Sequence, residues 1–282
     1  MPDAPHAAAH PAAAPTSARR LALAGGAVAR ALLALLLPRH CVACGAALPS
    51  RSGEESEVVC GRCWASLLPL PYPRCARCGH PRRFRPGPAR LREHAARCEW
   101  CALLPPYVRA ARSVCWIPGG EATAIVHALK YDGWRAAAAG MGQRMARTDW
   151  PEDVAAERAG LVPVPLAPAR ERERGYNQSL LLAEALGAAW RLPVLAHVLC
   201  RARSTASQTR LTPGERLRNV AGAFHAPAAT RDRLSGAHLV LVDDVVTTAA
   251  TLNACAAALV AGGARILSYV TFARAPAAGD AR

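Results

Sequence analysis

The sequence predicts an α/β protein with a parallel sheet, preceded by a small N-terminal module rich in cysteine. From about residue 112 onward, short apolar runs alternate with segments of helical apolar spacing. This alternation is typical of strands and helices that build a parallel sheet covered on both faces. Before that point, eight of the 11 cysteines fall into Cys-x-x-Cys pairs. We expect a disordered tail over 1–29, a helix and cysteine module over 30–108, the α/β domain over 109–275, and a tail over 276–282.

The elements of the α/β domain can be predicted one by one. Apolar runs predict strands over 113–117, 161–165, 193–200, 238–242 and 265–272. Helical spacing predicts helices over 121–130, 136–147, 178–189 and 248–261, with Asn177 as an N-cap and Gly262 and Gly263 ending the last helix. The polar, arginine-rich segment 201–224 is too long for an ordinary connection, which favours a functional loop.

The composition narrows the class of protein. About half of the residues are apolar, so a sizeable core is available, and the net charge is +15. Such a charge is typical of proteins that meet phosphates, nucleic acid or anionic membranes, but an arginine-rich coding bias gives the same balance. Residues 21–37 are apolar, yet Arg30 interrupts them and the run is shorter than the roughly 20 residues of a membrane span. With no cleavage site evident, we predict an amphipathic helix, no transmembrane segment and a cytoplasmic protein.

The cysteine pairs predict two structural zinc sites. The gaps between successive pairs are 15, 11 and 19 residues, and the first and last of these fit the four-thiolate zinc pattern. Two thiolates on one tight turn point the same way, and two such turns close a tetrahedron around zinc. Crossed pairing or one empty site stays open at this point. Disulfides are disfavoured because the rest of the chain can build its own core. The expected ligands are Cys41, Cys44, Cys60, Cys63, Cys75, Cys78, Cys98 and Cys101.

The second half of this module carries many arginines together with Phe84 and Trp100. Arginine interleaved with aromatic rings can follow a nucleic-acid backbone and stack bases. A solvated arginine-rich face explains the same pattern equally well.

The run over 239–252 predicts a phosphate site. An apolar strand ends in Asp243 and Asp244, and a turn of threonine and alanine leads into a helix. A helix N-terminus offers unpaired N–H groups and the positive end of a dipole, so a phosphate binds there readily. The paired acids can accept hydrogen bonds from a ribose diol. The expected phosphate-binding residues are Thr247, Thr248, Ala249, Ala250 and Thr251.

This run resembles the diphosphoribosyl-binding motif of type I phosphoribosyltransferases, which implies that fold for the α/β domain. It departs from the motif at Ala249, which takes the position of a glycine. If that position needs a positive φ, alanine costs about 1 kcal/mol. Further segments, together with the cysteine pairs, resemble the ComF/GntX family of competence proteins, with its double zinc ribbon. These segments are 129–133, 162–166, 172–179, 208–211 and 216–224.

The resemblance implies several roles. Asp243 and Asp244 would be the catalytic acids that hold the ribose of phosphoribosyl diphosphate, with Mg2+ bridging the diphosphate and the ribose hydroxyls. Segment 201–224 would be a flexible hood over the reacting centre. The candidates for the diphosphate are Lys130, Arg170, Arg172, Arg174, Gly175, Arg201, Arg203 and Arg210.

Three functions of different class are open, and the third of them is a zinc-bearing scaffold without catalysis. The first is a pentosyl-transferring glycosyltransferase, a phosphoribosyltransferase with an unknown acceptor, that binds phosphoribosyl diphosphate and acts in DNA uptake during natural competence. The second is a zinc protein that binds single-stranded DNA without transferase turnover. Other competence proteins at the inner membrane are implied as partners in either case.

Overall fold

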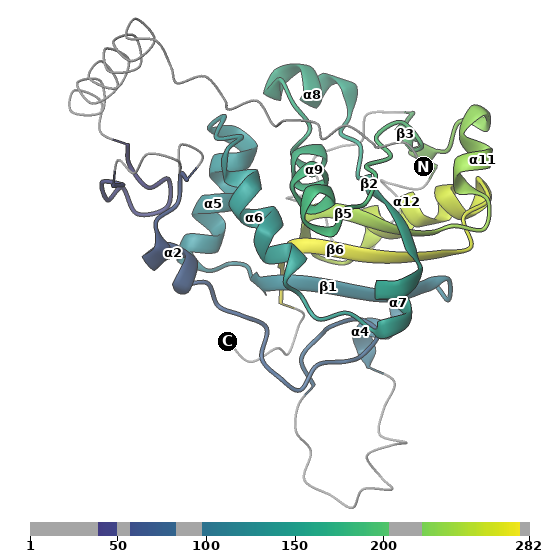
Figure 1. Ribbon diagram of the computed structural model, residues 1–282, viewed down its shortest axis with the longest axis horizontal. Coiled ribbons are helices and arrows are strands. Elements are labelled where there is room, and N and C mark those ends of the chain that lie inside the picture. The colour runs from purple at the N-terminus through teal and green to yellow at the C-terminus, as the bar shows by residue number, and fades with distance from the viewer. Residues whose placement is uncertain (1–38, 50–56, 83–97, 203–221, 277–282) are drawn as a thin grey trace, which may run out of the picture.

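The computed structural model describes residues 39–49, 57–82, 98–202 and 222–276 (Figure 1). The predicted N-terminal tail, the apolar run over 21–37 and nearly all of the predicted C-terminal tail lie outside these residues. Among the described residues, no helix is both long enough and apolar enough to cross a membrane.

The centre of the molecule is a parallel sheet, as predicted. Its strands are β1 (Val108–Trp116), β2 (Arg158–Pro163), β5 (His238–Val246) and β6 (Ile266–Arg274), in the order β1-β6-β5-β2. All three pairings are parallel. The central strands β5 and β6 are rich in β-branched and aromatic residues and are buried along nearly their whole length, which is typical of a sheet covered on both faces.

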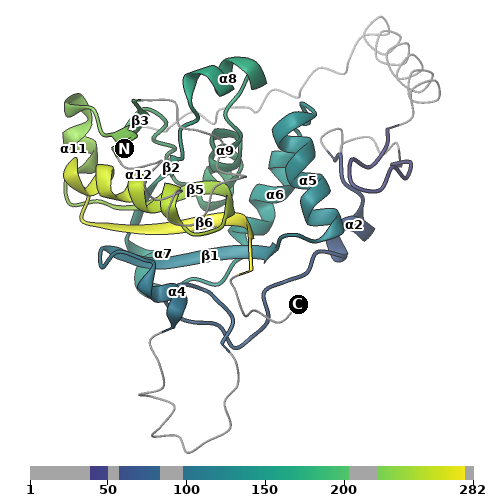
Figure 2. The same cartoon turned by 180° about the vertical axis from the view of Figure 1, so that it is seen from behind.

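Helices cover the two faces of this sheet (Figures 1 and 2). One face carries α5 (Gly120–Tyr131), α6 (Ala137–Ala146) and α9 (Gln178–Trp190), whose apolar side chains share a core with β5 and β6. The other face carries α12 (Ala250–Ala261), which packs with part of the cysteine module. The described chain is therefore an α/β protein with an N-terminal cysteine module, which confirms the predicted class.

Several short elements were not predicted. They are α2 (Gly61–Ala65) and α4 (Glu99–Ala102) in the cysteine module, α7 (Glu152–Glu157), α8 (Pro168–Arg174), the 3-10 helix η2 (Ala228–Thr230) and α11 (Arg231–Leu234). A proline opens α8, and Gly175 closes it with a φ of 76°. These are ordinary start and stop signals of a helix, but only about two turns separate them, which is too short for apolar periodicity to emerge.

The predicted strand over 193–200 is wrong. Only Val194 bridges to β2, at Leu161, and the chain then leaves the sheet. At its end, β3 (Cys200–Arg201) pairs antiparallel with β4 (Phe224–His225). The apolar side chains between these points are buried by packing instead of by strand pairing, and a short apolar run does not distinguish the two. The β3–β4 pairing joins the two ends of the predicted hood, most of which lies outside the described residues.

The cysteine module covers the outer edge of β1, the strand at one end of the sheet. Pro69 bridges to Cys115, and the Ala111 amide donates to the Arg77 carbonyl at 2.8 Å. The contact is so close that a Cβ on Gly79 would lie 2.5 Å from the Ala111 carbonyl oxygen, so glycine is required there. An uncovered edge strand is a site of aggregation, and here the module pairs with it directly.

Candidate functional site

The first cysteine site is built from two tight turns. Cys41 and Cys44 share the first turn, Cys60 and Cys63 flank the start of α2, and the four sulfurs lie within 4.8 Å of one another. The Sγ atoms of Cys44 and Cys60 are 3.8 Å apart. A zinc–sulfur bond of roughly 2.3 Å in a tetrahedron requires sulfurs about 3.8 Å apart, so this group fits zinc.

The second cysteine site has the same construction. It joins Cys75 and Cys78 to Cys98 and Cys101, with Sγ distances of 3.4 Å from Cys75 to Cys101 and from Cys78 to Cys98. The sequential pairing of the turns is therefore confirmed, and crossed pairing is excluded by the grouping of the sulfurs. Four thiolates leave no open position on zinc, which makes both sites structural.

Both acids of the predicted phosphate site lie inside β5 and not at its end. The predicted strand stops at Val242, but Val245 and Val246 continue the pairing with β6. The pairing with β2 does stop at Val242. Asp243 therefore lies just past the end of one neighbouring strand, while β6 continues alongside it.

Asp244 is buried and forms an ion pair with Lys130 of α5. Its Oδ2 lies 2.8 Å from the Lys130 Nζ, and the two side chains are 4% and 22% exposed. Burial opposes the charge on Lys130, but the Asp244 carboxylate, and to a lesser degree Asp243, outweighs it and raises the pKa of Lys130. The lone lysine of the chain is thus placed at the acid pair, where it neutralises one carboxylate.

Asp243 makes different contacts. Its Oδ1 accepts hydrogen bonds from the Ser179 hydroxyl and from the Asp244 amide, each at 2.9 Å. Burial first, and the neighbouring Asp244 carboxylate second, raise the pKa of Asp243 to about 7. Ser179 was not assigned a role from the sequence. The available signal was its place in the first turn of a helix whose N-cap, Asn177, is confirmed by the bond from the Ser179 amide to Oδ1.

The loop after β5 turns into α12 through a left-handed residue. Ala249 has a φ of 58°, so the glycine position of the motif does need a positive φ. α12 begins at Ala250, two residues later than predicted, and no side chain caps its N-terminus. A small hollow lies against this turn and is lined by Asp243, Val245, Val246, Thr247, Ala249, Ala250, Thr251 and Leu252. The buried Thr248 Oγ1 has no hydrogen-bond partner among the described residues. An acid, hydroxyls and a free helix N-terminus therefore meet at one hollow, an arrangement typical of anion sites.

The predicted diphosphate residues are only partly brought together. Arg201 lies near enough to Arg170 and Asp243 to respond to both charges, and its guanidinium stacks on Phe224 at 5.2 Å. Arg174 donates to Gln178 and lies over the Tyr131 ring, and Arg172 is exposed on α8. The Gly175 carbonyl accepts a hydrogen bond from Arg135. Arg203 and Arg210 lie outside the described residues.

Two members of the aromatic arginine face suggested for the cysteine module, Trp100 and Arg77, are turned inward, whereas Arg74 lies 4.1 Å from the ring centroid of the exposed Tyr72. Trp100 is 4% exposed and lies beneath Arg274, with 4.4 Å between the guanidinium carbon and the ring centroid. Arg77 donates to backbone carbonyls, including that of Val108 at 3.0 Å. Phe84 and the arginines from 83 to 97 lie outside the described residues.

Comparison with known proteins identifies the cysteine module. The double zinc ribbon domain family matches residues 32–102. With the two groups of four sulfurs, this match shows that the chain carries two cysteine-rich zinc-binding sites of structural type.

Part of the chain is similar to proteins with names from DNA uptake and use. Competence protein F of Haemophilus influenzae is 37% identical over 93 residues, which are 33% of this chain and 40% of that protein. The DNA utilization protein YhgH of Escherichia coli K12 is 38% identical over 104 residues, 37% of this chain and 44% of that protein. Competence protein ComFC of Bacillus subtilis is 34% identical over 103 residues, 36% and 39% of the two chains. The aligned part thus spans less than half of each relative. These relatives and the double zinc ribbon confirm the predicted resemblance of the chain to the ComF family.

Proposed function

We propose that this chain binds phosphoribosyl diphosphate and acts in DNA uptake. The observation that carries the ligand assignment is the hollow at the end of β5, where Asp243, the left-handed Ala249 and the uncapped N-terminus of α12 meet. The names of the relatives support the process.

The chemistry of the hollow fits a ribose 5-phosphate. Amides at the start of α12 and the hydroxyls of Thr247 and Thr251 would bind the 5-phosphate. Asp243 would accept hydrogen bonds from the ribose hydroxyls once it is ionised. Asp244, held by Lys130, would act by keeping β5 and α5 in place and by raising the pKa of Asp243.

Magnesium would enter with the ligand. Among the described residues, the only groups of three or more close metal-ligating side chains are the two cysteine sites. Mg2+ commonly keeps several waters and binds through one or two carboxylates together with substrate phosphates. Asp243 supplies such a carboxylate, so these residues fit an ion shared with the diphosphate.

Transferase chemistry would be displacement at the anomeric carbon. A bond forms between an acceptor and that carbon while the bond to diphosphate breaks, and diphosphate leaves with the electron pair. The chain would contribute position and charge: Arg201, which responds to the charges of Asp243 and Arg170, is a candidate for holding the diphosphate together with Arg170.

Titration calorimetry tests the ligand assignment. The full chain, loaded with zinc, is titrated with phosphoribosyl diphosphate and Mg2+ at pH 8, where Asp243 is ionised. We expect saturable binding in the wild type and at least about tenfold weaker binding in Asp243→Asn, because one hydrogen bond to a charged group contributes about 1.5–3 kcal/mol. Equal affinity in the two proteins would argue against the site.

A surface beside α5 favours the second function, binding of single-stranded DNA. Tyr131 and Trp134 are 63% and 45% exposed, which is unusual for large rings, and Arg174 lies 5.2 Å from the Tyr131 ring centroid. Stacking of a base on an aromatic ring contributes about 1–3 kcal/mol. Binding of an oligothymidine that weakens with salt and weakens further in Trp134→Ala would support this function; binding that is absent at low salt would exclude it.

A further inference from the structure

The second zinc site carries a charge that two buried arginines can balance. One zinc ion and four thiolates sum to a net charge of −2. Arg274 and Arg112 are 1% and 6% exposed, and among the described residues neither forms an ion pair with a carboxylate. An unpaired charge in the interior is strongly unfavourable. The Asp149 carboxylate attracts Arg112 without an ion-pair contact, whereas the favourable charges acting on Arg274 come from cysteines of the second site.

Both arginines face the cysteine turn. The Arg274 Nη2 donates to the Cys78 carbonyl at 2.6 Å, and the Arg112 Nη2 donates to the Ala76 carbonyl at 2.9 Å. The Arg274 guanidinium also lies over Trp100, which sits between the ligands Cys98 and Cys101. Its Nη1 is buried and has no hydrogen-bond partner in the described part of the chain. The two strands β1 and β6 thus present cations to both turns of the second site.

Arg274 is also adjacent to the anion-binding loop. It is the last residue of β6 and pairs in register with Val246, the last residue of β5, which directly precedes Thr247. The next residue of the chain, Ala275, donates its amide to the Val246 carbonyl at 2.8 Å. A shift of Arg274 therefore shifts the start of the loop.

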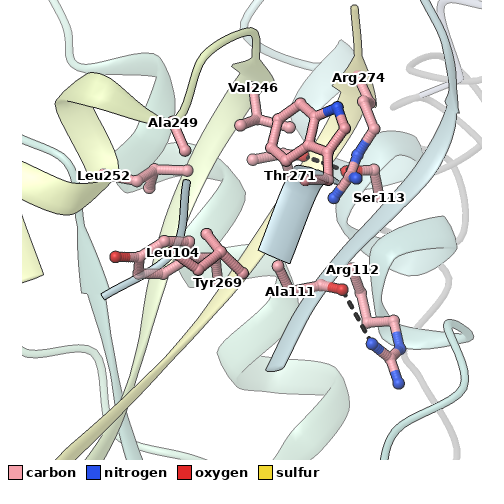
Figure 3. Close-up of a pocket in the computed structure, with 11 residues that line it drawn as sticks. Leu104, Ala111, Arg112, Ser113, Val246, Ala249, Leu252, Tyr269, Thr271 and Arg274 are labelled. Atoms are coloured by element: carbon pink, nitrogen blue, oxygen red, sulfur yellow. Dashed lines mark hydrogen bonds between the residues drawn. The ribbon is translucent and has the colours of Figure 1, made fainter. Parts of the chain in front are cut away.

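A second connection runs from the zinc turn to α12. The Asn253 Nδ2 donates to the Leu103 carbonyl, just beyond Cys101, at 2.7 Å, and the Asn253 Oδ1 accepts from the Tyr269 hydroxyl at 3.0 Å. A small cavity lies beside this connection, where Leu104 faces Ala249 of the loop and Leu252 of α12 (Figure 3). Ser113, Thr271 and Arg274 form the opposite wall, where the Ser113 and Thr271 hydroxyls are 2.7 Å apart (Figure 3).

We infer that the zinc-loaded second cysteine site is the counter-charge of Arg274 and, together with the Asp149 carboxylate, of Arg112, and that Arg274 and Asn253 transmit its position to the loop over 247–251. Arg274 and Asn253 are positioning residues, since neither lines the hollow at Asp243. The consequence for phosphate affinity rests on the proposed function. The link between the second zinc and the loop does not.

Zinc release and hydrogen exchange test this inference on the full chain with two zinc ions bound. In Arg274→Gln we expect one zinc per chain to pass to a colorimetric chelator about 10- to 100-fold faster than in wild type, the usual effect of losing a partner of a metal ligand. The amides over 247–253 should exchange faster in the same variant, with those of α9 unchanged. Arg144→Gln is the matched control, because Arg144 lies 3.6 Å from the Trp64 ring centroid beside the first site and should leave the second zinc and the loop as in wild type.

Asn253→Ala provides a variant that keeps both buried charges. We expect wild-type zinc release from this protein but faster exchange over 247–253. The inference is overturned if Arg274→Gln releases zinc at the wild-type rate, or if exchange over 247–253 stays at wild-type level in either variant. A wild-type chain that binds no phosphoribosyl diphosphate would sink the proposed function alone, since the zinc and exchange measurements need no ligand.

Discussion

At the scale of single residues, Asp243 owes its properties to its place in the sheet. The pairing of β5 with β2 stops at Val242, the residue before Asp243. The Ser179 hydroxyl donates a hydrogen bond to the Asp243 carboxylate. One oxygen accepts two hydrogen bonds, but burial and the Asp244 charge outweigh them, and the pKa of Asp243 rises to about 7. The residue can therefore change its charge near neutral pH.

This raised pKa predicts a pH dependence of stability. The folded chain holds a proton on Asp243 between about pH 4 and pH 7 that the unfolded chain has lost. Unfolding then becomes easier as the pH rises through that window, by at most about 1.4 kcal/mol per pH unit. Urea unfolding of wild type and Asp243→Asn at pH 5, 6, 7 and 8 measures it. We expect the stability of the variant relative to wild type to increase with pH; a constant difference would contradict the raised pKa.

Ala249 predicts a second outcome at this scale. Its left-handed φ of 58° costs about 1 kcal/mol or more for alanine. In Ala249→Gly the relief of this strain offsets the lost burial of a methyl group, about 0.8 kcal/mol. We therefore expect a free energy of unfolding within about 0.5 kcal/mol of wild type and phosphate binding that is equal or tighter.

Ala250→Gly is the matched control for this change. Ala250 is also buried, but it has helical backbone angles as the first residue of α12. The substitution should lower the free energy of unfolding by about 1–2 kcal/mol, because glycine is a poor helix former and the methyl packing is lost. Equal losses in the two variants on urea unfolding would show that Ala249 is unstrained.

The sequence predicts residue chemistry better than residue partners. The glycine position of the motif raised the question of a positive φ at Ala249, and the structure has one. Nothing in the spacing indicated that Asp244 faces Lys130 of a distant helix while Asp243 faces Ser179. Which of two adjacent acids meets which cation depends on how helices pack over the sheet, and one-dimensional patterns do not contain that information.

At the scale of elements, the Lys130–Asp244 ion pair joins α5 to β5. The two helices α6 and α9 pack close together on the same face, where Gly142 leaves room for Ala185. The acid pair is thus held by one ion pair to α5 and one hydrogen bond from Ser179 of α9, in a helical layer whose other contacts with the sheet are mainly apolar. Removing one partner of such a buried pair leaves an uncompensated charge.

The ion pair predicts a strongly coupled pair of substitutions. Lys130→Met should lower the free energy of unfolding at pH 8 by about 3–5 kcal/mol, and Lys130→Met with Asp244→Asn should be more stable than the sum of the two single losses predicts. Arg265→Met is the control, because the Arg265–Glu157 pair is 52% and 48% exposed and contributes at most about 1 kcal/mol. Additive losses for Lys130 and Asp244 would mean that the ion pair contributes nothing to the connection.

The observed ends of an element match the predicted ends where the buried apolar residues and the regular secondary structure cover the same stretch. The helices over 121–130 and 178–189 are observed within a residue or two of their predicted ends, since their apolar faces meet the sheet. β1, β5 and β6 each differ from prediction by two to five residues at one end, because polar residues such as Asp243 are paired as well. The run over 193–200 was wrongly predicted as a strand, because its apolar side chains are buried although its backbone does not pair continuously with a neighbouring strand.

At the scale of the whole molecule, the cysteine module and the sheet share their cores. Trp64 of the first site packs edge-on against Phe272 at 6.2 Å between ring centroids, and Trp100 of the second site packs under Arg274. The cysteine spacing predicted two sites and their pairing. Where each site docks could not be predicted in full, because these two ring contacts join segments more than 150 residues apart.

This shared core predicts the effect of metal removal. Metal analysis should find two zinc ions per chain, one for each group of four sulfurs. Stripping zinc under reducing conditions should lower the melting temperature of the entire protein in one transition, because both cysteine sites pack on the sheet. Two separate calorimetric transitions, with the α/β domain melting as in the zinc-loaded protein, would show that the cysteine module and the α/β domain unfold independently.

In the proposed function, the loop and first turn of α12 hold the phosphate of a phosphoribosyl ligand. Hydrogen exchange of the zinc-loaded chain, with and without phosphoribosyl diphosphate and Mg2+, measures this most directly. We predict that the ligand slows exchange of the amides over 247–252, and that inorganic phosphate at high concentration slows the same amides more weakly. Ligand binding that leaves these amides unchanged, or protection found only elsewhere in the chain, would contradict the claim.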